Sequence, residues 1–191
     1  MEVALGLFAG VGLSAAAGFR LFVPFLIMSL ASLTGNLELA PGFEWIGTYP
    51  AFFVFAVATV LEVAAYFIPW LDNLLDTIAT PAAVVAGVLA TAAMVSGMSP
   101  LLRWTLAAIA GGGVAGAVQA STVTVRAFST ASTGGLGNPI VAIGEFVSSV
   151  VTTIMAIVVP VLTFVVLVIV LLLVGRQLRR LTARRARRTS A

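Results

Sequence analysis

The sequence STVTVRAFSTASTGGLGNP, from Ser121 to Pro139, is a polar stretch inside a very apolar chain. It contains Arg126, seven hydroxyl side chains, three glycines and an Asn138-Pro139 pair, and long hydrophobic runs flank it on both sides. Lipid cannot satisfy polar groups, so within a bilayer this stretch must be buried in protein or line water. Its hydroxyl residues are Ser121, Thr122, Thr124, Ser129, Thr130, Ser132 and Thr133.

The composition of the whole chain indicates that lipid surrounds most of it. Of 191 residues, 61% are hydrophobic and only 9% are charged, whereas an average soluble domain carries roughly 25% charged residues. Residues 1–175 are therefore predicted to form a single transmembrane domain. The chain has no cysteine and no histidine, which removes the commonest metal ligands and the commonest general base. We expect no enzymatic activity, no metal and no cofactor.

The C-terminal segment 176–191 is strongly basic. Seven of the ten arginines fall between Arg176 and Arg188, directly after an apolar run. Such a segment is typical of a cytoplasmic tail that contacts anionic lipid. Binding to nucleic acid is the less favoured interpretation, because the arginines follow a predicted membrane span.

The hydrophobic pattern predicts about six membrane-spanning helices, since ~20 apolar residues cross a bilayer core. The loop 34–50 carries two glutamates and no basic residue, so it should face away from the cytoplasm. With six spans both termini lie on one side, and the basic tail places that side in the cytoplasm. The predicted spans are 3–33, 51–69, 78–98, 104–125 and two more within 140–175, which we divide near Met155–Pro160.

Two ladders of small residues indicate an internal repeat. A shift of 106 residues places Gly6, Gly10, Ser14 and Gly18 on Gly112, Gly116, Ala120 and Thr124, and places Arg20 on Arg126. An apolar segment with one acidic residue, Glu62 or Glu145, follows in each half. The proposed copies, 3–98 and 101–175, would have three spans each and opposite orientations. The alternative is that small-residue ladders only indicate close helix packing.

The fold class that follows is an all-α polytopic membrane helix bundle, built from two inverted three-span repeats with interrupted helices. Inverted repeats recur in transporters, whose binding sites lie near the midplane at interrupted helices. Three segments also resemble a bacterial membrane family catalogued as domain of unknown function 4126. The resemblance covers most of the chain apart from the tail, and it implies a bacterial inner-membrane protein without supplying a substrate. The segments are GLSAAAGFRLFVPF, EVAAYFIPWLDNLLDTIATP and ASTVTVRAFSTASTGGLGNPIVAIGE.

The two intramembrane arginines, Arg20 and Arg126, are the main candidate site residues. A charge at the centre of a span costs about 2.5–3.5 kcal/mol on the insertion scale, so each needs a partner. They could form salt bridges with Glu62 or Glu145 that hold the bundle together. They could also bind an anionic or polar solute together with nearby polar side chains. The proposed contacts to solute are Arg20, Arg126, Ser121, Thr122, Thr124, Ser129 and Asn138.

The acidic residues allow further interpretations. Glu62 and Glu145 either neutralise the arginines or carry protons in coupled transport, and Asp72 and Asp76 are further candidates for charge pairing or proton coupling. Asp72 and Asp76 share a helix face, and we interpret them as a solvated helix start with Asp72 as its cap. They could instead act as the acid pair of a lipid-modifying enzyme, which ranks last because no nucleophile motif accompanies them. The hydroxyls of 121–133 could also bond back to helix carbonyls.

The sequence therefore leaves two functional hypotheses. The first is a small transporter or channel whose anionic or polar solute binds at the interface of the repeats. The second is a non-catalytic structural or accessory subunit of a larger membrane complex. A homo-oligomer and a membrane-protein partner are both compatible with the sequence.

Overall fold

The computed structural model describes the backbone of residues 1–65 and 69–189, and the side chains within these ranges except those of 69–77, 174 and 177–189. Within the described residues the regular structure is helical and no strand occurs. The α-helices are α1 (Glu2–Phe19), α2 (Val23–Leu33), α3 (Tyr49–Ala65), α4 (Pro69–Met94), α5 (Pro100–Leu106), α6 (Gly113–Thr133), α7 (Asn138–Val158) and α8 (Pro160–Thr189). A 3₁₀ turn, η1 (Glu44–Gly47), precedes α3, and a π-helical segment, η2 (Ala107–Gly112), joins α5 to α6.

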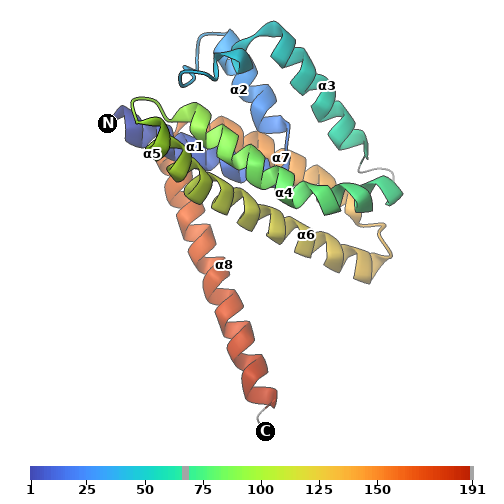
Figure 1. The fold of residues 1–191 in the computed structure, drawn as a ribbon. Coiled ribbons are helices and arrows are strands. Elements are labelled where there is room, and N and C mark those ends of the chain that lie inside the picture. The colour runs from blue at the N-terminus through green and yellow to red at the C-terminus, as the bar shows by residue number, and fades with distance from the viewer. Residues whose placement is uncertain (66–68, 190–191) are drawn as a thin grey trace.

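Helix α1 forms the centre of the bundle, and α4, α6, α7 and α8 pack around it (Figure 1). Every residue from Ala9 to Gly18 is buried, as expected of a helix that is apolar on all sides. Small side chains allow this close packing. A Cβ atom at Gly10 would lie 2.9 Å from Thr91 Cα of α4, and one at Gly18 would lie 2.7 Å from the Ala115 carbonyl oxygen of α6. The first ladder of small residues is therefore a packing surface.

Hydroxyl groups from neighbouring helices bond to the backbone of α1. Thr91 donates to the Gly10 carbonyl at 3.0 Å and Ser149 donates to the Ala16 carbonyl at 2.9 Å. In the opposite direction, Ser14 of α1 donates to the carbonyl of Gly111. These buried contacts fix the positions of α4, η2 and α7 around α1, because a buried donor left without an acceptor would be costly.

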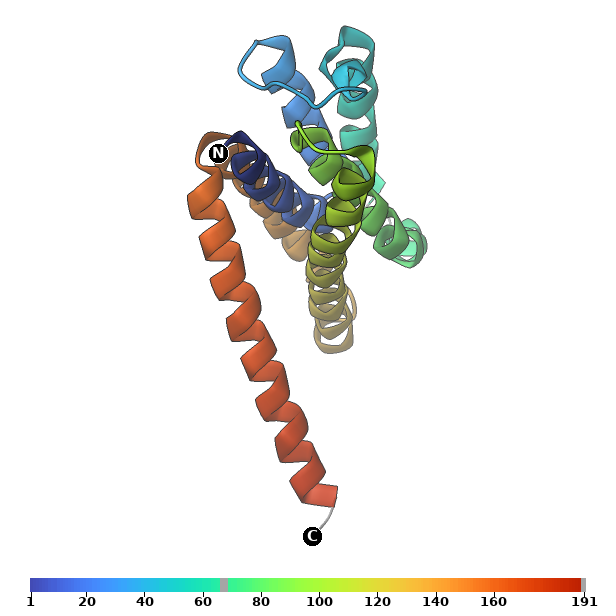
Figure 2. The same ribbon diagram turned by 60° about the vertical axis from the view of Figure 1, so that its left-hand side comes forward.

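Helices α2 and α3 form a hairpin to one side of the bundle, and α8 extends away from it, as Figures 1 and 2 both show. Only the first turns of α8 pack on α1, where Phe8 stacks on Phe164 with 4.4 Å between ring centroids. The outward surfaces of α3, α7 and α8 expose many large apolar side chains. This distribution is appropriate for contact with lipid.

By length and composition, three helical segments among the described residues could cross a membrane: Glu2–Phe19, Pro100–Thr133 and Asn138–Val158. Shorter apolar helices lie at Val23–Leu33, Tyr49–Ala65, Ile78–Met94 and Pro160–Leu173. The all-helical, membrane-type class is confirmed. The predicted break near Met155–Pro160 is also found, because α7 ends at Val158 and α8 begins at Pro160.

The helix boundaries differ from the prediction in two places. The predicted span 104–125 continues without a break to Thr133 and so includes Arg126, and the chain turns only at Gly134, whose φ of 64° suits glycine. Residues 69–77 are the first turns of α4, so the helix starts before the predicted span 78–98. Asp72 therefore lies inside this helix and is not its cap. The side chains of Asp72 and Asp76 lie outside the described ones.

Candidate functional site

A buried ion cluster joins α1, α6 and α7. Arg126 of α6 binds Glu145 of α7 through both nitrogens of its fork: Nε lies 2.9 Å from Oε1, and Nη2 donates to Oε2. Arg126 is 4% exposed and Glu145 is 6% exposed. Such two-point guanidinium–carboxylate contacts are among the strongest hydrogen-bonded ion pairs. The pair fixes the rotation of α6 relative to α7.

Arg20 reaches the same carboxylate from the end of α1. Its Nη2 lies 3.2 Å from Glu145 Oε2 and 2.7 Å from the carbonyl oxygen of Ala142. The helix ends at Phe19, and Arg20 adopts an extended conformation with φ −145° and ψ 127°. This conformation directs the side chain toward α7. The two arginines that the sequence analysis selected as site residues therefore lie close together, and they share one acidic partner, Glu145.

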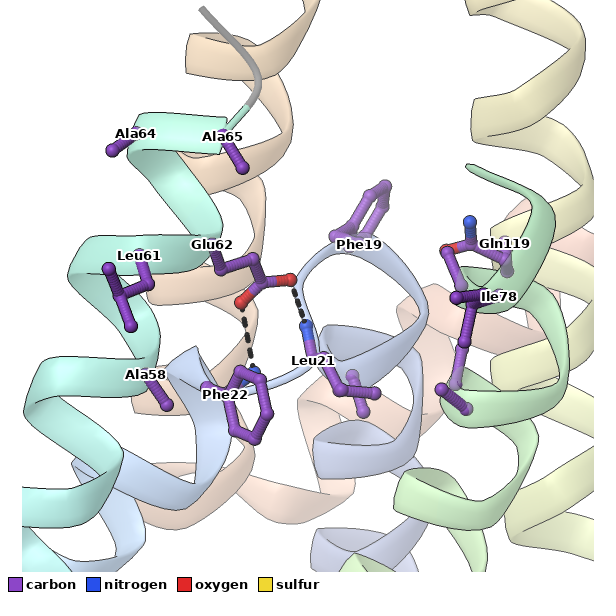
Figure 3. Close-up of a pocket in the computed structure, with 14 residues that line it drawn as sticks. Phe19, Leu21, Phe22, Ala58, Leu61, Glu62, Ala64, Ala65, Ile78 and Gln119 are labelled. Atoms are coloured by element: carbon purple, nitrogen blue, oxygen red, sulfur yellow. Dashed lines mark hydrogen bonds between the residues drawn. The ribbon is translucent and has the colours of Figure 1, made fainter. Parts of the chain in front are cut away.

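Glu62 of α3 binds backbone, not a guanidinium group. Its Oε1 accepts a hydrogen bond from the Leu21 N–H at 2.7 Å and its Oε2 accepts one from the Phe22 N–H at 3.1 Å (Figure 3). These amides lie in the break between α1 and α2, where the chain has left one helix and not yet begun the next. A carboxylate at a helix N-terminus also interacts favourably with the helix dipole. Glu62 therefore stabilises the break.

The four charges form one electrostatic group. The positive charge of Arg20 and the negative charge of Glu145 both act on Glu62. Among the residues whose side chains are described, the group contains two arginines and two glutamates. Glu145 therefore neutralises the arginines through direct contact, as the sequence analysis allowed. Glu62 interacts with Arg20 through its charge, and its hydrogen bonds go to backbone N–H groups.

A cavity of about 580 Å³ lies beside the break, between the α2–α3 hairpin and α4. Among the described residues that line it, all are apolar except Glu62 of α3 and Gln119 of α6 (Figure 3). A second cavity of about 350 Å³ shares Leu21, Phe22 and Ala82 with the first and is lined by apolar side chains. The first volume falls within the range of small-molecule sites, which are typically apolar with a few polar groups.

The predicted hydroxyl residues do not gather at this cavity. Ser121, Thr122 and Thr124 each donate to a carbonyl of their own helix, at 2.7–2.9 Å, as the alternative interpretation expected. Ser121 and Thr124 are exposed, whereas Thr122 and Ser129 lie on the buried face with Arg126. Beyond the helix end, Asn138 exchanges hydrogen bonds with Thr130. These residues support the helix and its turn.

Gln119 was missed by the sequence analysis. It is 7% exposed and lines the cavity, and its side-chain amide has no hydrogen-bond partner among the described residues. A signal was present, because Gln119 lies seven residues before Arg126 and so falls on the same helix face. The polar residues of that face are Gln119, Thr122, Arg126 and Ser129.

The fold and the site define an all-helical, membrane-type protein with a buried ion cluster and an adjacent apolar cavity. The chain belongs to the family described as Domain of unknown function (DUF4126), whose model matches residues 7–180. The family that the sequence motifs suggested is thus confirmed. No curated protein and no solved structure matches the chain.

Proposed function

We propose that this protein is a small transporter of the bacterial inner membrane, and that its solute binds in the 580 Å³ cavity beside the α1–α2 break. One observation carries the proposal: an interrupted helix adjoins a cavity of ligand size, and Glu62 and Gln119 are the polar groups among the described residues of its wall. In membrane transporters, sites of this kind lie at interrupted helices. The solute is a small molecule with a polar group that faces these two side chains.

This proposal changes the role of the arginines. Arg20 and Arg126 already share Glu145, and both are almost fully buried. The negative charge of this carboxylate opposes the binding of an anion at either guanidinium group. We therefore assign the arginines to holding α1, α6 and α7 in position, and we assign contact with the solute to Glu62 and Gln119.

The proposed topology has six spans: α1 with α2, then α3, α4, α6, α7 and α8. The loop between α2 and α3 contains Glu38 and Glu44 and no basic residue, and we place it outside the cell. The arginines of 176–188 place the C-terminus in the cytoplasm, against anionic lipid. Two inverted repeats remain part of the proposal. The observation that supports the repeats is that one glycine of each ladder, Gly10 and Gly116, packs against α4.

Flux measurements in proteoliposomes test the transport function. The panel contains radiolabelled polyols, amino acids, carboxylates and ammonium compounds, together with a fluorescent phospholipid. We expect one class to cross faster than in protein-free vesicles. Ala79→Phe should abolish the difference because Ala79 lines the cavity, whereas Ala108→Phe on an exposed position should not. A panel in which no compound is carried, with folded protein present, refutes transport.

A structural or accessory role is the second candidate, and the sealed ion cluster favours it. Buried ion pairs can hold helices in register without contacting any solute. The exposed apolar surfaces of α3 and α7 would then pack against other membrane helices. Purification from native membranes in a mild detergent distinguishes the two candidates, because an accessory subunit should retain a stoichiometric partner. Recovery of the protein alone would exclude this role.

A further inference from the structure

The cavity beside the helix break has a defined hydrogen-bonding chemistry, and from it we infer the class of ligand. We propose that it binds an uncharged single-chain amphiphile whose head group, a hydroxyl or an amide, lies between Glu62 and Gln119. This inference rests on the proposed function only in using the same cavity. Binding can be measured without transport.

The first argument is the shape and polarity of the wall. Phe19, Leu21, Phe22, Leu61 and Ile78 supply large apolar surfaces around the cavity, and alanines of α3 and α4 fill the spaces between them. Burying apolar area is favourable by roughly 25 cal/mol per Å². An alkyl chain therefore gains from this wall, whereas a strongly hydrated solute such as a sugar would lose more hydration than two polar groups can replace.

The second argument is the unpartnered amide of Gln119. This residue is 7% exposed, lines the cavity, and has no side-chain hydrogen bond among the described residues. A side-chain amide offers two donors and one acceptor. A ligand that fills this part of the cavity must bond to these groups, because otherwise it would leave them buried without partners. Gln119 thus indicates a ligand with both donor and acceptor capacity.

The third argument is the acceptor capacity that remains at Glu62. Each carboxylate oxygen accepts one backbone N–H, from Leu21 or from Phe22. A carboxylate has about four acceptor positions in total, so Glu62 can still accept from a ligand. Figure 3 draws Glu62 on α3 and Gln119 on α6 among the residues that line the same cavity. A head group with its own donor can bond to Glu62, and Gln119 in the same wall offers donors to the ligand.

The charges beside the cavity disfavour ionised head groups. Arg20 and Glu145 both act electrostatically on Glu62. A carboxylate ligand would face Glu62 with like charge and could donate nothing to it. An ammonium ligand would place a second positive charge near Arg20 in a largely apolar cavity, at a large desolvation cost. A hydroxyl or amide avoids both penalties.

Photolabelling of the full chain in phosphatidylcholine nanodiscs tests the inference. Three matched probes carry the same diazirine-bearing decyl chain and end in a hydroxyl, a carboxylate or an ammonium group. Mass spectrometry locates the labelled peptides. We expect the alcohol probe to label residues 58–65 and 78–83, and an excess of unlabelled decan-1-ol to compete. Labelling of exposed apolar positions on α7, such as Val151 and Ile154, should not saturate, because it reports only lipid contact.

Two variants make the test specific. Gln119→Leu removes the amide at similar size, so it should weaken competition by decan-1-ol about ten-fold, the equivalent of ~1.4 kcal/mol. The same change should leave the ligand-free protein as stable or more stable, since the amide it removes has no partner in the described protein. If Gln119 had a purely structural role, the substitution would instead lower the stability of the ligand-free protein. Ala79→Phe should abolish saturable labelling by filling the cavity.

The outcomes separate the ligand class from transport. Saturable labelling by the alcohol together with absence of flux would keep the ligand class and refute the transporter. Flux together with stronger labelling by the ammonium or carboxylate probe would keep the transporter and overturn the uncharged head group. Labelling that fails to saturate with any of the three probes would overturn the binding site itself.

Discussion

Replacement of Glu145 by glutamine tests whether one carboxylate holds three helices together. In the structure this side chain binds Arg126 at two points and also lies 3.2 Å from Arg20 Nη2. Glutamine keeps the size of the side chain but removes its negative charge and one acceptor oxygen. Two guanidinium groups, each at most 4% exposed, would then remain buried without their common counter-ion.

The expected loss of stability follows from the cost of breaking a buried pair. Removing one partner typically costs about 3–5 kcal/mol, because the other charge is left uncompensated. The membrane insertion scale gives a similar value, about 2.5–3.5 kcal/mol for one charge at a span centre. We therefore expect Glu145→Gln to lower the free energy of unfolding by about 3–5 kcal/mol. For a chain of this length that corresponds to a fall in Tm of about 6–20 °C.

A double variant gives the control for this prediction. Arg126→Met with Glu145→Gln removes one positive and one negative charge, and leaves Arg20 with Glu62, on which it already acts. The double variant should lose less stability than Arg126→Met and Glu145→Gln lose in sum, and the difference is a coupling energy of about 0.5–3 kcal/mol. Thr105→Val, on an exposed hydroxyl that bonds its own helix, should change stability little.

The free energies are measured by titrating purified protein from a mild detergent into SDS and following helix content by circular dichroism. Equal midpoints for the wild type and Glu145→Gln would refute the ion cluster as the tie between α1, α6 and α7. A double variant that loses the sum of both single effects would show that Arg126 and Glu145 act independently, which the observed two-point contact does not allow.

Three further predictions concern packing, the turn and the topology. Gly87→Val should lower Tm strongly, because a Cβ atom there would lie 2.5 Å from Ala115 Cβ. Gly144→Ala should be neutral or raise stability by up to ~1 kcal/mol, because a Cβ atom there meets nothing within 4 Å. Thermal unfolding compares the two variants. Gly134→Ala should cost about 1–2 kcal/mol in the same assay, since φ is 64° and the site is otherwise open. A cysteine at Asn36 should react with an impermeant maleimide in intact cells, and one at Ser190 only after permeabilisation; the reverse pattern would invert the proposed topology.

The sequence predicted the class of the protein well, because that class depends on composition and on runs of apolar residues. The need of Arg20 and Arg126 for acidic partners was predictable for the same reason, since a buried charge is costly wherever it lies. The identity of the partner was not predictable. It depends on which helix packs beside which, and two glutamates, Glu62 and Glu145, were available.

The polar stretch 121–139 shows a further limit of the sequence analysis. Its density of hydroxyls predicted a water-lined surface, yet Ser121, Thr122 and Thr124 satisfy their donors on their own helix. Local bonds of this kind are always available to serine and threonine in helices, so hydroxyl count alone does not locate a site. Gln119 cannot satisfy itself in the same way, and it was the more informative residue of this helix.

The two glutamates differ because the two arginines stand in different backbone settings. Arg126 lies within a continuous helix whose N–H groups are satisfied, so the acid beside it, Glu145, is free to bind side chains. Arg20 follows the end of α1, and there the N–H groups of Leu21 and Phe22 have lost the helical acceptors that a continuous helix would provide. Glu62 supplies those acceptors. The cavity lies at this interruption, beside the carboxylate that stabilises it. Arg126, which the proposed repeat aligns with Arg20, lies in a regular helix. The cavity therefore adjoins the arginine at which the helix is interrupted.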